Sequence, residues 1–130
     1  MTLNKILTAS LIVVHILLIT SCAKDAKVSE DDFDMTSWKN DPQGCKGDRA
    51  IIDQDFMKIK DKLLGVSITG IRKTLGAPDR VDLDNRSTKQ YVYFVQKGGQ
   101  CEDSDEQSVG KSYRIYFDAL ELVREISPEL

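Results

Sequence analysis

Histidine is almost absent from this sequence of 130 residues. The single histidine, His15, lies in an apolar run near the N-terminus, so a chain cleaved after Ser21 would contain none. Without an imidazole, a serine or cysteine nucleophile lacks its usual general base, and two remaining cysteines make a poor zinc site. We therefore expect no enzyme activity, no metal site and no cofactor.

Basic residues are also too few to bind nucleic acid. Cleavage would remove Lys5 and leave 17 basic against 21 acidic residues, a formal net charge of −4. Phosphate binding requires a basic stripe, so nucleic acid is not expected as a partner. Residues 22–130 suffice for one small domain, which offers little room for a buried small-molecule site.

The N-terminus has the pattern of a signal peptide. Asn4 and Lys5 precede an apolar run over residues 6–19, and Ile19-Thr20-Ser21-Cys22 reads as a lipobox. The pattern predicts a signal peptide over residues 1–21 and a lipid-modified N-terminus at Cys22, which would anchor the protein to a membrane. The alternative is an uncleaved anchor, because the apolar run is just long enough to span a bilayer.

The two other cysteines are expected to form a disulfide. Export would place Cys45 and Cys101 in an oxidising compartment, where pairing is the default. Their separation of 56 residues would make the bond worth about 4 kcal/mol in the loop-entropy model. A metal site and a catalytic thiol are less favoured alternatives.

The segment that follows Cys22 is polar and acidic. Its low apolar content predicts a flexible tether over residues 22–40, with ordered structure beginning near Trp38. Ser29-Glu30-Asp31-Asp32 also resembles the acidic export signal of surface lipoproteins in the Bacteroidetes, and this alternative stays open. Residues 41–130 then form the folded domain.

Two helices are predicted at the start of this domain. Asp48 is a suitable N-cap for the first helix, and Gly65 a suitable C-cap. Ser67 caps the second, which Gly76 and Pro78 end. Each helix has one apolar face, formed by Ile52, Phe56, Ile59 and Leu63 in the first and by Ile68, Ile71, Thr74 and Leu75 in the second.

Three β-rich runs and a weaker one complete the domain. The strong runs cover residues 90–96, 112–118 and 120–126, and the weak run covers residues 80–83. No late connection is long enough for a crossover helix, so the strands should be antiparallel. We expect an α+β fold with two N-terminal helices packed on one face of a three- to four-stranded antiparallel sheet.

Two surfaces are candidates for binding a partner. Only one face of the sheet can pack on the helices, so some strand residues should be exposed, and exposed tyrosines favour protein contact. This candidate partner surface comprises Tyr91, Tyr93, Tyr116 and Arg114. The second candidate is an acidic loop formed by Glu102, Asp103, Asp105 and Glu106, which lacks the glycine and closing glutamate of a calcium loop.

The order of these features resembles a known family. The lipobox, the two helices, Leu75-Gly76-Ala77-Pro78-Asp79 and the antiparallel sheet are similar to the SmpA/OmlA (BamE-like) family of small outer-membrane lipoproteins, over roughly residues 48–126. Tyr91-Val92-Tyr93-Phe94 and Ile115-Tyr116-Phe117-Asp118 add to the match. The Cys45 and Cys101 pair and the acidic loop depart from the family pattern.

The resemblance implies a helix-helix-sheet fold and a noncatalytic binding role. We expect an envelope lipoprotein that acts through protein–protein contacts in outer-membrane assembly or maintenance. Its expected location is the outer membrane, facing the periplasm or the cell surface. The alternative is an inhibitor or immunity-type lipoprotein whose acidic loop enters the basic cleft of an exported enzyme or toxin.

Overall fold

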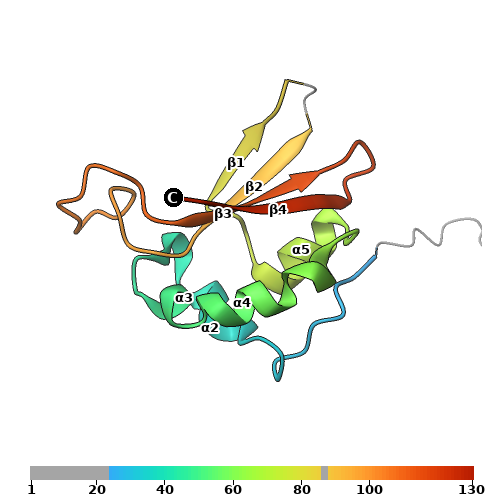
Figure 1. The fold of residues 1–130 in the computed structure, drawn as a ribbon, viewed down its shortest axis with the longest axis horizontal. Coiled ribbons are helices and arrows are strands. Elements are labelled where there is room, and N and C mark those ends of the chain that lie inside the picture. The colour runs from blue at the N-terminus through green and yellow to red at the C-terminus, as the bar shows by residue number, and fades with distance from the viewer. Residues whose placement is uncertain (1–23, 86–87) are drawn as a thin grey trace, which may run out of the picture.

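A four-stranded antiparallel sheet forms one layer of the domain (Figure 1). The computed structural model describes residues 24–85 and 88–130, so the predicted signal peptide and Cys22 lie outside the described residues. The strands follow one another in chain order across the sheet, and helices occupy one side of it, which confirms the α+β class. The strands are β1 (Arg80–Leu83), β2 (Lys89–Phe94), β3 (Ser112–Phe117) and β4 (Val123–Glu129).

The helical layer is more divided than the expected pair of helices, so that finer prediction is not confirmed. It contains α2 (Met35–Asn40), η1 (Pro42–Gly44), α3 (Asp48–Ile51), α4 (Asp53–Ile59), η2 (Lys60–Leu63) and α5 (Ile68–Leu75). The predicted first helix is broken at Ile52, whose backbone leaves the helical region with ψ of 12°. The second matches α5, where the Ser67 hydroxyl accepts a hydrogen bond from the Gly70 amide.

Antiparallel register assigns the strand side chains to two faces. Tyr91 lies opposite Ile115, and Tyr93 lies opposite Tyr113, all on the inner face toward the helices. Val92 and Arg114 face each other on the outer face. The last strand begins later than predicted, at Val123, because residues 118–121 form a turn in which the Asp118 carboxylate accepts hydrogen bonds from two backbone amides.

Aromatic rings connect the helical layer to the sheet. The Trp38 ring of α2 stacks on Phe56 of α4 with centroids 4.7 Å apart, and Phe56 contacts Tyr113 of β3 at 4.5 Å. The Asp53 carboxylate at the start of α4 accepts hydrogen bonds from the Tyr113 hydroxyl and the Lys111 ammonium, each at 2.6 Å. Apolar and polar contacts together therefore fix α4 against β3.

The predicted tether over residues 22–40 is wrong for its described part. Phe33 and Trp38 are 2% and 0% exposed and belong to the hydrophobic core. The Asp34 carboxylate caps α2 by accepting a hydrogen bond from the Ser37 amide, at 2.8 Å. The acidic composition was misleading because isolated large apolar residues anchor the segment, while one of its carboxylates caps a helix.

Candidate functional site

The structure corrects half of the predicted tyrosine-bearing surface. Tyr91 and Tyr93 are buried on the inner face, where Tyr91 packs edge-on against Phe117 with centroids 5.0 Å apart. The Tyr93 hydroxyl donates a hydrogen bond to the Gly76 carbonyl at 2.9 Å, and burial raises the pKa of Tyr93. These two tyrosines cannot contact a partner, because the helical layer covers the face that they occupy.

Arg114 lies on the outer face, but its guanidinium is fully engaged within the domain. It donates two hydrogen bonds to the Glu129 carboxylate, at 2.6 and 3.1 Å. It also donates to Asp82 at 2.6 Å and to Gln90 at 2.8 Å. These partners come from β4, β1 and β2, so the side chain clamps the outer face across all four strands. The hydrogen bonds to Glu129 raise the pKa of Arg114, and the hydrogen bond to Asp82 lowers the pKa of that carboxyl.

Tyr116 is the predicted contact tyrosine that the outer face retains. It is half-buried in β3, and the Arg124 guanidinium lies 6.0 Å from the centre of its ring. Gln90 of β2 and Glu125 of β4 are its cross-strand neighbours. Among the described residues, the outer face therefore presents Tyr116 beside charged side chains and no row of tyrosines.

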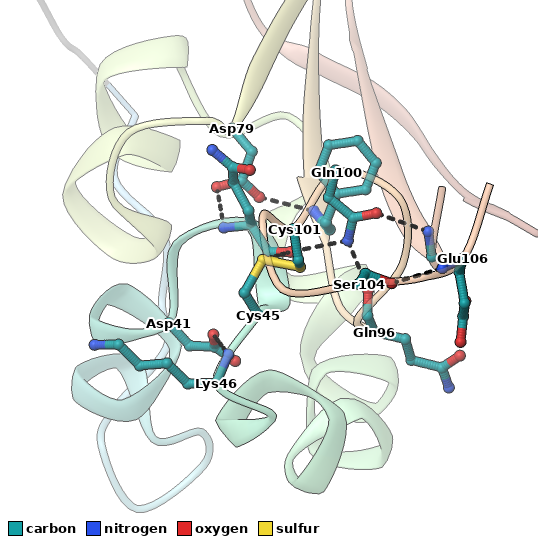
Figure 2. The surroundings of a disulfide bond; sticks show 12 residues. Asp41, Cys45, Lys46, Asp79, Gln96, Gln100, Cys101, Ser104 and Glu106 are labelled. Carbon is teal, nitrogen blue, oxygen red and sulfur yellow. Dashed lines mark hydrogen bonds between the residues drawn. A yellow bond between two sulfur atoms is a disulfide. The ribbon is translucent and has the colours of Figure 1, made fainter. Parts of the chain in front are cut away.

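A disulfide joins the segment between η1 and α3 to the loop between β2 and β3 (Figure 2). Cys45 and Cys101 form this bond, which confirms the predicted pair, and their Cα atoms are 5.7 Å apart. The Gln100 amide nitrogen next to it donates hydrogen bonds to the Gln43 and Gln96 carbonyls, at 3.1 and 2.8 Å. The disulfide and the Gln100 side chain therefore both attach the base of this loop to the segment around η1.

The acidic loop projects from this attached base. Glu102, Asp103, Asp105 and Glu106 are all exposed. Within residues 24–85 and 88–130, none of their carboxylates forms an ion pair with a lysine or arginine. An open cavity of about 490 Å³ lies at the loop base, where Lys46 and Lys97 join Glu102 and Asp103 in its lining. The loop thus presents concentrated negative charge to solvent on a fixed base.

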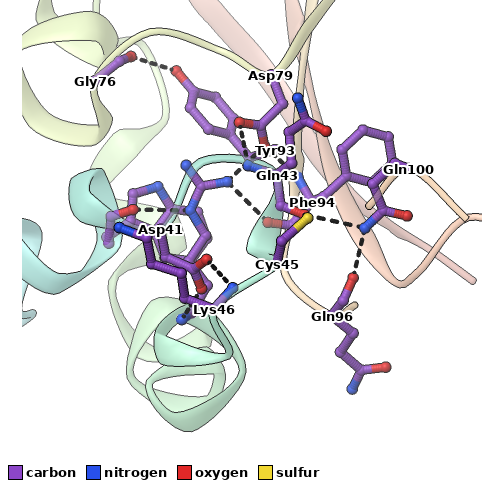
Figure 3. A network of polar contacts seen from close by, with 12 residues as sticks. Asp41, Gln43, Cys45, Lys46, Gly76, Asp79, Tyr93, Phe94, Gln96 and Gln100 are labelled. Carbon is purple, nitrogen blue, oxygen red and sulfur yellow. Dashed lines mark hydrogen bonds and ion pairs between the residues drawn. The ribbon is translucent and has the colours of Figure 1, made fainter. Parts of the chain in front are cut away.

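A buried polar network lies beside the disulfide, and sequence analysis missed it (Figure 3). The Arg49 guanidinium donates hydrogen bonds to the Trp38 and Phe94 carbonyls, both at 2.9 Å, and pairs with Asp79 at 2.6 Å. The Asp41 carboxylate accepts hydrogen bonds from the Arg49 and Lys46 amides, at 2.9 and 2.8 Å. Arg49 lies among the positions predicted to be helical, and nothing in the local sequence indicated that its side chain would be buried.

The described residues form neither a metal-binding cluster nor a membrane-spanning helix in this structure. In the part of the chain that it describes, no three side chains of the metal-binding types come together. Within the same residues, no helix has the length and apolar character required to cross a bilayer. The surface features that the structure brings together are an acidic loop held by a disulfide and an outer face clamped by Arg114.

Comparison with protein-family models, with curated proteins and with solved structures gives no significant match. The family resemblance of Leu75-Gly76-Ala77-Pro78-Asp79 therefore stays a hypothesis drawn from a short motif. In the structure this motif ends α5 and places Asp79 beside Arg49. The motif has a structural role in this chain whatever its family.

Proposed function

We propose that this chain is a noncatalytic bacterial envelope lipoprotein, anchored through Cys22, that acts by protein–protein contact in outer-membrane assembly or maintenance. The lipobox supports the anchor. In the BamE-like arrangement that we propose, α5 supplies one helix packed on the sheet, and α3, α4 and η2 together supply the other.

The acidic loop is the observation that carries the binding proposal. Its four carboxylates are exposed and have no cationic partner among the described residues, whereas Arg114 of the outer face is paired with Asp82 and Glu129. The disulfide and Gln100 limit the motion of the loop base, which reduces the entropy lost when a partner binds. We assign the contact to the loop, and Tyr116 is the remaining aromatic candidate.

The same loop supports a second function, that of an inhibitor or immunity-type lipoprotein. A fixed cluster of carboxylates complements the basic cleft of an exported enzyme or toxin, and such binding would weaken strongly with salt. Because the envelope assembly role is assigned to the same loop, it also predicts binding that weakens with salt. The identity of the partner therefore separates the two functions.

Lipidation is tested first, by metabolic labelling with palmitate. The wild-type protein should incorporate label, and the Cys22→Ala variant should not. Label that survives in this variant would overturn the proposed anchor. The Cys45→Ser variant is the matched control, because it changes another cysteine without touching the lipobox.

The partner is tested by crosslinked co-purification from native membranes, read by mass spectrometry. Recovery of barrel-assembly components supports the assembly function, and recovery of a single secreted enzyme or toxin supports the inhibitor function. The variant Asp103→Ser/Asp105→Ser should reduce recovery in either case, whereas Asp55→Ser, an exposed carboxylate of α4, should not. Equal recovery with both variants would contradict the assignment to the loop.

A further inference from the structure

The first described residues are seated on the N-terminal turn of α5. The Lys24 carbonyl accepts hydrogen bonds from the Ser67 amide at 2.9 Å and from the Ser67 hydroxyl at 3.1 Å. The Lys73 ammonium pairs with Asp25 at 2.9 Å. Gly70 allows this close approach, because a Cβ atom there would lie 2.8 Å from the Lys24 carbonyl oxygen. The chain is therefore bound to the domain from Lys24 onward.

The turn between β3 and β4 also contacts the N-terminal turn of α5 and the residues just before it. The Ile68 amide donates a hydrogen bond to the Glu121 carbonyl at 2.9 Å, and the Gly65 amide donates to Val123 at 2.8 Å. Two leucines are exposed beside these contacts, Leu64 by 44% and Leu120 by 78%. We call this region, with Lys24, Leu64 and Leu120, the anchor corner.

Chain length limits how far the lipid can lie from the anchor corner. Cys22 precedes Lys24 by two residues, which span at most about 7 Å when fully extended. A lipid attached to Cys22 would therefore leave the protein close to the two exposed leucines. The chain reaches the domain at one end of its long axis, and the loop between β2 and β3 lies at the other end (Figure 1).

We propose that the anchor corner lies directly on the lipid bilayer, with Leu64 and Leu120 in the interface, so that the acidic loop points away from the membrane. This proposal rests on the proposed lipidation at Cys22. Two features of the corner favour lipid contact. Leu64 and Leu120 are exposed and apolar, and the nearby carboxylates Asp25 and Glu121 are paired with Lys73 and Lys89, at 2.9 and 2.7 Å. A short bound connection holds the domain in one orientation, which a free tether over residues 22–40 could not do.

Hydroxyl-radical footprinting of the lipidated full-length protein on phosphatidylcholine vesicles tests this orientation. Leu120 and Ile51 form a matched pair, because they are 78% and 81% exposed and Ile51 lies in α3 near the opposite end. In the proposed orientation, Leu120 should be oxidised several times more slowly than Ile51. Equal oxidation on vesicles that retain the protein would overturn the orientation and leave lipidation intact.

A linker variant provides the second measurement. Insertion of about ten Gly and Ser residues between Ala23 and Lys24 leaves every described contact in place but allows the domain to move away from the lipid. Leu120 should then be oxidised as fast as Ile51. Continued protection of Leu120 in this variant would show that the short connection does not set the orientation. Failure of the wild-type protein to float with the vesicles would overturn the proposed anchor, and the orientation with it.

Discussion

Arg49 and Asp79 form a buried ion pair, with 2.6 Å between their charged atoms and with side chains 2% and 3% exposed. The Asp79 carboxylate also accepts hydrogen bonds from the Phe94 and Gln43 amides, at 2.8 and 2.9 Å. One carboxylate thus joins α3, η1 and the end of β2. This is why the aspartate of the Leu-Gly-Ala-Pro-Asp motif matters in this fold.

Asp79→Ala should be strongly destabilising. The change leaves a buried guanidinium without its counter-charge and two backbone amides without their acceptor. Removal of one partner from a buried ion pair typically costs about 3–5 kcal/mol. Urea denaturation at constant pH measures the effect as a lower transition midpoint.

Two further variants show whether this cost comes from the ion pair. Asp55→Ala removes a partner of Lys58 at the exposed surface and should cost less than about 1 kcal/mol. Arg49→Met combined with Asp79→Leu removes both charges and should recover part of the lost stability. If Asp79→Ala costs no more than Asp55→Ala, the buried pair has no special role.

Loss of the disulfide should reduce stability by a similar amount. The bond closes a loop with a sequence separation of 56 residues, so the double variant Cys45→Ser/Cys101→Ser should be destabilised by about 4 kcal/mol. Urea denaturation under non-reducing conditions measures this difference. Thiol counting on the unfolded, unreduced protein is the independent check, and two free thiols would refute the bond.

Acid should destabilise the protein partly through Asp82. The hydrogen bond from Arg114, with a further contribution from Arg80, holds the pKa of Asp82 below its usual value of about 3.9. A carboxyl whose pKa is lower in the folded state stabilises the protein above the unfolded pKa. This contribution is lost as the pH falls from about 5 through the folded pKa.

The Asp82→Asn variant should therefore show a shallower loss of stability with acid than the wild-type protein. Denaturation midpoints measured from about pH 5 to pH 2 give the two slopes. Arg114→Met, which removes the hydrogen-bond donor, should flatten the slope in the same sense. Identical slopes for Asp82→Asn and the wild-type protein would mean that Asp82 has no part in acid sensitivity.

Phe33→Ala tests whether the acidic N-terminal segment belongs to the folded domain. The ring contacts Trp38 and Phe56, at centroid distances of 5.4 and 5.9 Å, and is almost fully buried. Its truncation should cost about 3–5 kcal/mol in the free energy of unfolding. Asp31→Ala, an exposed neighbour, should have almost no effect. A neutral Phe33→Ala would restore the interpretation of this segment as a tether.

Some features of the fold follow directly from local sequence. Ser67 and Gly76 mark the two ends of α5, because capping and helix termination depend on neighbouring backbone groups. Period-two alternation likewise predicts β2 and β3. The Cys45–Cys101 bond followed from the cysteine count, since no other pair was available after Cys22 is assigned to lipid.

Other features depend on which surfaces meet, and local pattern does not contain that information. Alternation correctly separates Tyr93 from Phe94 but does not say which face the helices will cover, so Tyr91 and Tyr93 were wrongly expected at the surface. Arg49 looks like an ordinary helix-surface residue until Asp79, 30 positions away, supplies its counter-charge. The sequence alone determined both ends of α5, the alternation of β2 and β3 and the cysteine pair. Tertiary structure decided burial, because burial depends on long-range packing between elements.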